Sequence, residues 1–173
     1  MSGRRVDVTT PDGRMDTYLF EPAGTGQWPA VIFYMDAFGV RPQLDGMARR
    51  LADNGYVVAV PNLYYRSGAF APFDPKTVFG EGPERERFKG MIASIDGTKV
   101  MRDTAALIDV VDEQPSVRSG KMGAVGYCMG GGYAIGALGS FPLRVASAAS
   151  FHGGSLATDK PDSPHLLAPQ MRG

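Results

Sequence analysis

The chain has 173 residues, a length that favours one domain with its own hydrophobic core. Hydrophobic residues make up 43% and charged residues 21%, as in an ordinary globular protein. Its 18 lysines and arginines balance its 18 aspartates and glutamates, so composition argues against nucleic acid or an anionic membrane as a partner.

Further function classes are excluded by what the chain lacks. The N-terminal MSGRRVDVTTPDG has no apolar run behind its arginines, so we expect no secretory signal, and no apolar stretch is long enough to span a bilayer. The single cysteine, Cys128, allows no internal disulfide. With only His152 and His165 besides, we expect neither a metal site nor a cofactor, and a cytoplasmic location.

The first half of the chain predicts a hairpin, two buried strands and a helix. Turn residues Pro11-Asp12-Gly13 separate two short runs, residues 4–10 and 14–21. Residues 28–35 (WPAVIFYM) and 56–60 (YVVAV) are nearly unbroken apolar runs, typical of strands buried on both faces. Between them, residues 42–54 carry apolar side chains at helical spacing before Gly55.

The second half continues the alternation after an irregular segment, residues 62–83, whose length is typical of a functional or flexible loop. We then expect helices over residues 84–92, 96–112 and 129–139 and strands over residues 121–127 and 145–151. This order predicts one α/β domain with a mainly parallel sheet and flanking helices.

The segment GAVGYCMGGG places Cys128 where a strand ends and a helix begins, with Gly126 and Gly130 two positions to either side. Such a turn projects the side chain outward and crowds the backbone, which glycines relieve. The pattern is the nucleophile elbow G-x-S-x-G with cysteine in place of serine. A helix start favours the thiolate, and the Met129 N–H faces any oxyanion formed on an attacked carbonyl.

Other interpretations of this segment stay open. A lone cysteine is often a small buried hydrophobic residue, and glycines between strand and helix can serve packing alone. Phosphate cradling is the weaker alternative: no G-x-G-x-x-G occurs, and Gly126 and Gly131 have Walker spacing without the following Lys-Ser/Thr. A redox-sensing cysteine is a further alternative.

The chain resembles the dienelactone hydrolase family, a cysteine-using branch of the α/β-hydrolase fold. Four segments carry the resemblance: VIFYMDAFGV at residues 31–40, GYVVAVPNLYYR at 55–66, GAVGYCMGG at 123–131 and SFHGG at 150–154. The resemblance implies a hydrolase of carboxylic esters or lactones, of the dienelactone (carboxymethylenebutenolidase) type. Its implied partner is a small ester or lactone bearing a carboxylate.

The resemblance also implies roles for particular residues. Cys128 is the nucleophile, and Asp36, in place of the family's glutamate, pairs with the resting thiol. The oxyanion donors are the N–H groups of Ala37 and Met129. Arginine suits a carboxylate-bearing substrate; the candidates are Arg66, Arg85 and Arg87, of which Arg66 and Arg85 are our substrate-binding predictions, and His152 is expected near the pocket.

An α/β hydrolase also needs an acid and a histidine after the nucleophile. Only 45 residues (173 − 128) follow Cys128, and His152, His165, Asp159 and Asp162 do not match the family's positions for these groups. We therefore expect residues 1–173 to be a single α/β-hydrolase domain lacking the C-terminal third, as a monomer or homodimer. The alternatives are a non-catalytic module that binds a small molecule and an inactive truncated fragment.

Overall fold

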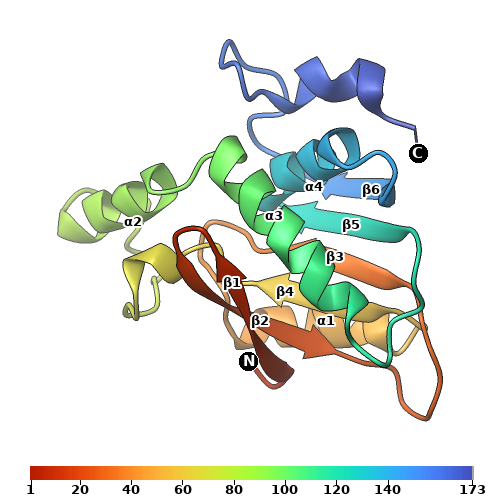
Figure 1. The fold of residues 1–173 in the computed structure, drawn as a ribbon. Coiled ribbons are helices and arrows are strands. Elements are labelled where there is room, and N and C mark those ends of the chain that lie inside the picture. Colours follow the sequence, from red (N-terminus) through yellow and green to blue (C-terminus); the bar gives the residue numbers. More distant parts are fainter. Residues whose placement is uncertain (173) are drawn as a thin grey trace.

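A computed structural model describes residues 1–172, and these form one mixed sheet of six strands in the spatial order β1-β2-β4-β3-β5-β6 (Figure 1). The strands are β1 (Arg4–Thr10), β2 (Gly13–Phe20), β3 (Ala30–Tyr34), β4 (Val57–Pro61), β5 (Met122–Tyr127) and β6 (Val145–Phe151). The strands β1 and β2 form an antiparallel hairpin, and β2 is antiparallel to β4. The others pair in parallel, which confirms the predicted α/β fold.

Residues 1–172 also form four α-helices and two 3₁₀ helices, of which the last in the chain follows the last strand. They are α1 (Pro42–Ala52), η1 (Tyr65–Ser67), α2 (Pro83–Ala93), α3 (Gly97–Asp112), α4 (Met129–Ser140) and η2 (Pro164–Gln170). The helices predicted from the sequence do not include η2. The buried Ser163 hydroxyl lies 2.8 Å from His165 Nδ1 and ties this turn together. No α-helix in residues 1–172 is long and apolar enough to cross a membrane.

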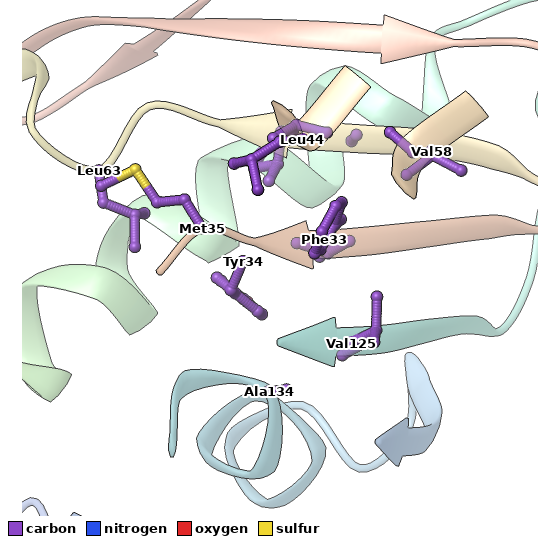
Figure 2. Packing of buried hydrophobic residues seen from close by; sticks show 14 of the residues in the cluster. Phe33, Tyr34, Met35, Leu44, Val58, Leu63, Val125 and Ala134 are labelled. Atoms are coloured by element: carbon purple, nitrogen blue, oxygen red, sulfur yellow. The ribbon is translucent and has the colours of Figure 1, made fainter. Parts of the chain in front are cut away.

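The helices lie on both faces of the sheet, with α3 and α4 on one face and α1 on the other (Figure 1). All five residues of β4 are buried, as its unbroken apolar run predicts for a strand covered on both sides. Figure 2 shows core side chains contributed by β3, β4, β5, α1 and α4. Asp96 caps the N-terminus of α3: its carboxylate accepts a hydrogen bond from Lys99 N–H at 2.8 Å.

The α1 face of the sheet is covered over only part of its width. Beside α1, an apolar groove of about 750 Å³ runs over β3, β5 and β6. It is lined by Phe33, Met47, Tyr127 and Phe151 among others, and Phe151 is 47% exposed. The strand β6 is also an edge strand of the sheet.

Candidate active site

Cys128 occupies a sharp, strained turn between β5 and α4. Its φ of 54° and ψ of −122° lie outside the regions that L-residues ordinarily adopt, at a cost of roughly 1–3 kcal/mol. The turn is fixed from the end of β6: Cys128 N–H donates to Phe151 O at 3.0 Å, and Cys128 O accepts from Gly154 N–H at 3.1 Å. The thiol-bearing residue is exposed, so it is not the buried hydrophobic cysteine of the alternative interpretation.

The glycines around Cys128 are required by contact distances. A Cβ atom on Gly126 would lie 2.0 Å from Gly130 O, and one on Gly130 would lie 2.6 Å from Met35 O. A Cβ on Gly131 would lie 2.5 Å from Ser150 Oγ. Real Cβ atoms do not approach other atoms this closely, which confirms that the glycine frame relieves crowding where α4 crosses β5 and the end of β3.

The segment after β3 forms a β-turn that directs one amide outward. Asp36 O accepts a hydrogen bond from Gly39 N–H at 3.1 Å, so Ala37 is the second residue of the turn and its N–H points away from the turn interior. Among residues 1–172, Ala37 N–H makes no hydrogen bond. Met129 is the first residue of α4, and its N–H has no partner within the helix.

Close packing joins the two elements that carry these amides. Because Gly130 has no side chain, the first turn of α4 lies directly against the Met35 carbonyl at the end of β3. Asp36 directly follows Met35, and Met129 directly precedes Gly130. Both predicted oxyanion donors, Ala37 and Met129, therefore come from segments that meet beside the elbow.

Asp36 forms an ion pair with Arg41, a partner that no sequence pattern indicated. Arg41 Nη1 donates to Asp36 Oδ1 at 2.6 Å and Nη2 to Oδ2 at 2.7 Å. Phe38 N–H also donates to Asp36 Oδ1 at 2.9 Å. No hydrogen bond in the described chain joins Asp36 to Cys128 Sγ, and the proposed pairing of Asp36 with the thiol stays a prediction.

Arg66 and Arg85 have very different surroundings. Arg66 makes a bidentate ion pair with Asp103, both hydrogen bonds at 2.8 Å, and a further 2.8 Å bond to Asp12. Its guanidinium also lies over the ring of Tyr65, 4.4 Å from the centroid. Arg85, on α2, makes only a long 3.4 Å hydrogen bond to Gly80 O among the described residues.

The helix that carries Arg85 packs against the turn after β3. The ring of Phe88, from α2, lies 5.2 Å from that of Phe38, and α2 projects on the side toward which the parallel strands point (Figure 1). Arg87, the third candidate, is held by Glu84 at 2.6 Å and lies over Phe73 at 4.0 Å. Of the three arginines, Arg85 therefore has the fewest competing contacts.

His152 lies at the end of β6 in a left-handed conformation, with a φ of 42°. It is exposed, and its ring lies 6.1 Å from that of Tyr127. This places it one residue beyond the carbonyl of Phe151 that anchors Cys128. Its predicted role near a substrate pocket stays a prediction.

The mainly parallel sheet, its covering helices and the strained elbow define an α/β hydrolase. The family model described as dienelactone hydrolase family matches residues 15–173. The chain belongs to the dienelactone hydrolase family.

Individual relatives agree with this membership. A putative carboxymethylenebutenolidase of Synechocystis sp. is 32% identical over 152 residues, which cover 86% of this chain and 58% of that protein. A carboxymethylenebutenolidase of Pseudomonas sp. strain P51 is 32% identical over 122 residues, covering 70% of this chain and 49% of that one. The chain thus spans about half the length of the curated relatives it matches.

Solved structures show the same fold. A putative dienelactone hydrolase from Klebsiella pneumoniae superposes with a TM-score of 0.80 at 21% identity, covering 98% of this chain and 68% of that one. At this identity the likeness speaks for the fold alone.

Proposed function

We propose that the chain carries the nucleophile and the oxyanion-binding amides of a hydrolase of carboxylic esters or lactones of the carboxymethylenebutenolidase type. The observation that carries this proposal is the exposed Cys128 on a strained elbow, next to segments whose Ala37 and Met129 amides have no hydrogen-bond partner within residues 1–172. Family membership and the names of the curated relatives support the same reaction class.

In the proposed reaction, Cys128 Sγ attacks the carbonyl carbon of the ester and forms a carbon–sulfur bond. The carbonyl π electrons move to oxygen, and the resulting oxyanion accepts hydrogen bonds from Ala37 and Met129 N–H. When the carbonyl reforms, the carbon–oxygen bond of the ester breaks and the alkoxide leaves. Water then hydrolyses the thioester, which releases the acid and restores the thiol.

This chemistry needs a base to deprotonate the thiol and activate water. We propose that the base, a histidine, and its acid partner lie in sequence outside these 173 residues, because the matched region covers 58% of the Synechocystis relative. Arg85 is the proposed contact for a substrate carboxylate, since Arg66 and Arg87 are held in other ion pairs. A cytoplasmic location and a monomeric or homodimeric state stay predictions.

The test is covalent labelling with an activated ester, p-nitrophenyl acetate, followed by mass spectrometry of the chain. Labelling is done at about pH 9, where buffer hydroxide can take the thiol proton in place of the absent histidine. We expect one acetyl group per chain, on Cys128, and release of one equivalent of p-nitrophenolate. The Cys128→Ala chain serves as control and should gain no acetyl group at this site. Labelling that is indifferent to this substitution would favour the non-catalytic binding module.

A further inference from the structure

Tyr64 lies beneath the site and bridges the two segments that carry the proposed oxyanion donors. It follows β4, and its side chain is fully buried. Its hydroxyl donates a hydrogen bond to Ala37 O at 3.0 Å. The same oxygen lies 3.9 Å from Met129 Sδ. One side chain thus contacts both the turn after β3 and the first residue of α4.

The contact with Ala37 differs in kind from the other hydrogen bonds of that turn. Gly39 N–H to Asp36 O and Phe38 N–H to Asp36 Oδ1 both lie within the turn, and Arg41 follows it by two residues. These bonds fix the shape of the turn but not its place in the molecule. The hydrogen bond from Tyr64 ties the carbonyl of Ala37 to the end of β4, and so fixes the position of the turn relative to the sheet.

The ring of Tyr64 has little freedom to move. It packs edge-on against Phe70, with ring centroids 5.8 Å apart. The backbone of Gly39 is also so close that a Cβ there would lie 3.3 Å from the Tyr64 ring and 3.1 Å from the Phe70 ring. Burial, with smaller contributions from Tyr133, Asp36 and Cys128, raises the pKa of Tyr64. The hydroxyl therefore keeps its donor proton throughout the neutral range.

We propose that Tyr64 is a positioning residue for acyl transfer: its hydroxyl holds the turn of Ala37 against the start of α4, so that both amides converge on one oxyanion. This inference rests on the proposed function. The chain order explains why the sequence did not reveal it, since Tyr64 lies 27 residues from Ala37 and 65 from Met129. Its only signal in the sequence is its place in the segment GYVVAVPNLYYR.

The role can be separated from a purely structural one by comparing two reactions of the same thiol. Acylation of Cys128 by p-nitrophenyl acetate passes through an oxyanion, whereas alkylation by iodoacetamide displaces iodide at an sp³ carbon and forms none. Losing a direct oxyanion donor costs about 10²–10³-fold in rate, so displacing one of two donors should cost less. We expect Tyr64→Phe to slow acylation about tenfold and to leave alkylation unchanged.

Tyr34→Phe is the matched control. Tyr34 is also fully buried, and its hydroxyl lies 2.8 Å from Thr104 Oγ1 on the α3 side of the sheet. This substitution removes a buried tyrosine hydroxyl and one hydrogen bond, as Tyr64→Phe does, but the lost bond joins β3 to Thr104 of α3 and involves neither Ala37 nor Met129. The ratio of acylation rate to alkylation rate should match that of the wild-type chain.

Each outcome decides a separate question. An unchanged ratio in Tyr64→Phe overturns the positioning role while wild-type acylation upholds the proposed function. Equal slowing of both reactions also overturns it, because the thiol itself is then affected. If the wild-type chain is not acylated at Cys128, the proposed function fails and this inference fails with it.

If Tyr64→Phe does not fold by circular dichroism, 3-fluorotyrosine introduced at position 64 alone takes its place. Fluorine makes the phenol more acidic with little change of volume. We then expect the acylation-to-alkylation ratio to fall at a lower pH than in the wild-type chain, as the donor proton is lost. A ratio with the wild-type pH profile would overturn the proposal.

Discussion

Arg41 and Asp36 form a bidentate ion pair in which each guanidinium nitrogen contacts a different carboxylate oxygen, at 2.6 and 2.7 Å. Arg41 also donates to Gly39 O at 3.1 Å, and its guanidinium lies 5.4 Å from the ring centroid of Phe38. The pair therefore closes the turn that carries Ala37. Asp36 stabilises the turn in two ways: its carboxylate accepts from Phe38 N–H, and its backbone carbonyl accepts from Gly39 N–H.

We expect Arg41→Gln to lower the free energy of unfolding by about 1 kcal/mol, since the pair is bidentate but partly exposed. Urea unfolding at low and high salt measures this loss of unfolding free energy, which should be smaller at high salt because salt screens the ion pair. Lys89→Gln is the control, because its pair with Glu86 is far more exposed. Equal losses for both substitutions would contradict this assignment.

The close approach of Gly126 to Gly130 predicts that neither tolerates a side chain. Gly126→Ala places a Cβ 2.0 Å from Gly130 O, and we expect a loss of about 3 kcal/mol or more in unfolding free energy. Gly46→Ala is the contrasting control: it lies inside α1 with open space at its Cβ. That change should stabilise by roughly 0.5–1 kcal/mol. Thermal unfolding of both variants tests the contrast, which equal effects would refute.

The Arg66–Asp103 pair predicts a large structural effect for an arginine that was predicted to bind substrate. Asp103 is 1% exposed and Arg66 14%, so removing Arg66 leaves a buried carboxylate without its charged partner and with only the Tyr65 hydroxyl, at 3.1 Å, among the described side chains. We expect Arg66→Met to cost about 3–5 kcal/mol of unfolding free energy.

Arg85→Met should leave stability within about 0.5 kcal/mol of wild type, because its side chain makes only a long hydrogen bond among the described residues. Denaturant unfolding of the two variants separates a structural arginine from one available to a ligand. A stable Arg66→Met chain would return Arg66 to the list of substrate contacts.

Two buried tyrosines, Tyr34 and Tyr64, and the partly buried Tyr133 predict a loss of stability at alkaline pH. Burial raises the pKa of Tyr34 and of Tyr64, and burial, with Asp96 and Asp162, raises that of Tyr133 to about 12. The tyrosine pKa in the unfolded chain is near 10, and in the folded chain it is higher. Above pH 10 the unfolded chain therefore loses these protons first, which favours unfolding. The folded chain keeps its full stability below about pH 10 and loses it as the pH rises further.

Unfolding free energy should therefore fall between about pH 9 and about pH 11, by up to about 1.4 kcal/mol per tyrosine for each pH unit above 10. Urea unfolding at several pH values measures the slope, and the Tyr133→Phe chain should show a shallower one. The same slope in both chains would show that Tyr133 ionises normally.

The apolar groove beside α1 predicts that this chain binds hydrophobic dyes. Phe151 stacks on Tyr127 at a centroid distance of 4.8 Å, and both line the groove. Open apolar surface of this kind binds dyes such as ANS and favours association. We expect ANS fluorescence to rise with the native chain and to fall in Phe151→Asp. Leu143→Asp, at a residue that is 74% exposed outside the groove, should leave it unchanged; an equal fall would place the dye elsewhere.

The sequence by itself determined the order of elements and the elbow. Apolar runs and helical spacing are local properties, and they located every strand and α-helix to within a few residues. The glycine pattern around Cys128 is also local, because the crowding it relieves arises within one strand–turn–helix unit.

Only the tertiary structure decided which polar groups pair. Arg66 contacts acids 54 and 37 residues away, and Tyr64 reaches Ala37 because β4 lies beside β3 in the sheet. Such partners depend on strand order, which periodicity does not encode. The open groove could not be predicted from the sequence either, because an apolar strand has the same sequence pattern whether or not a helix covers it.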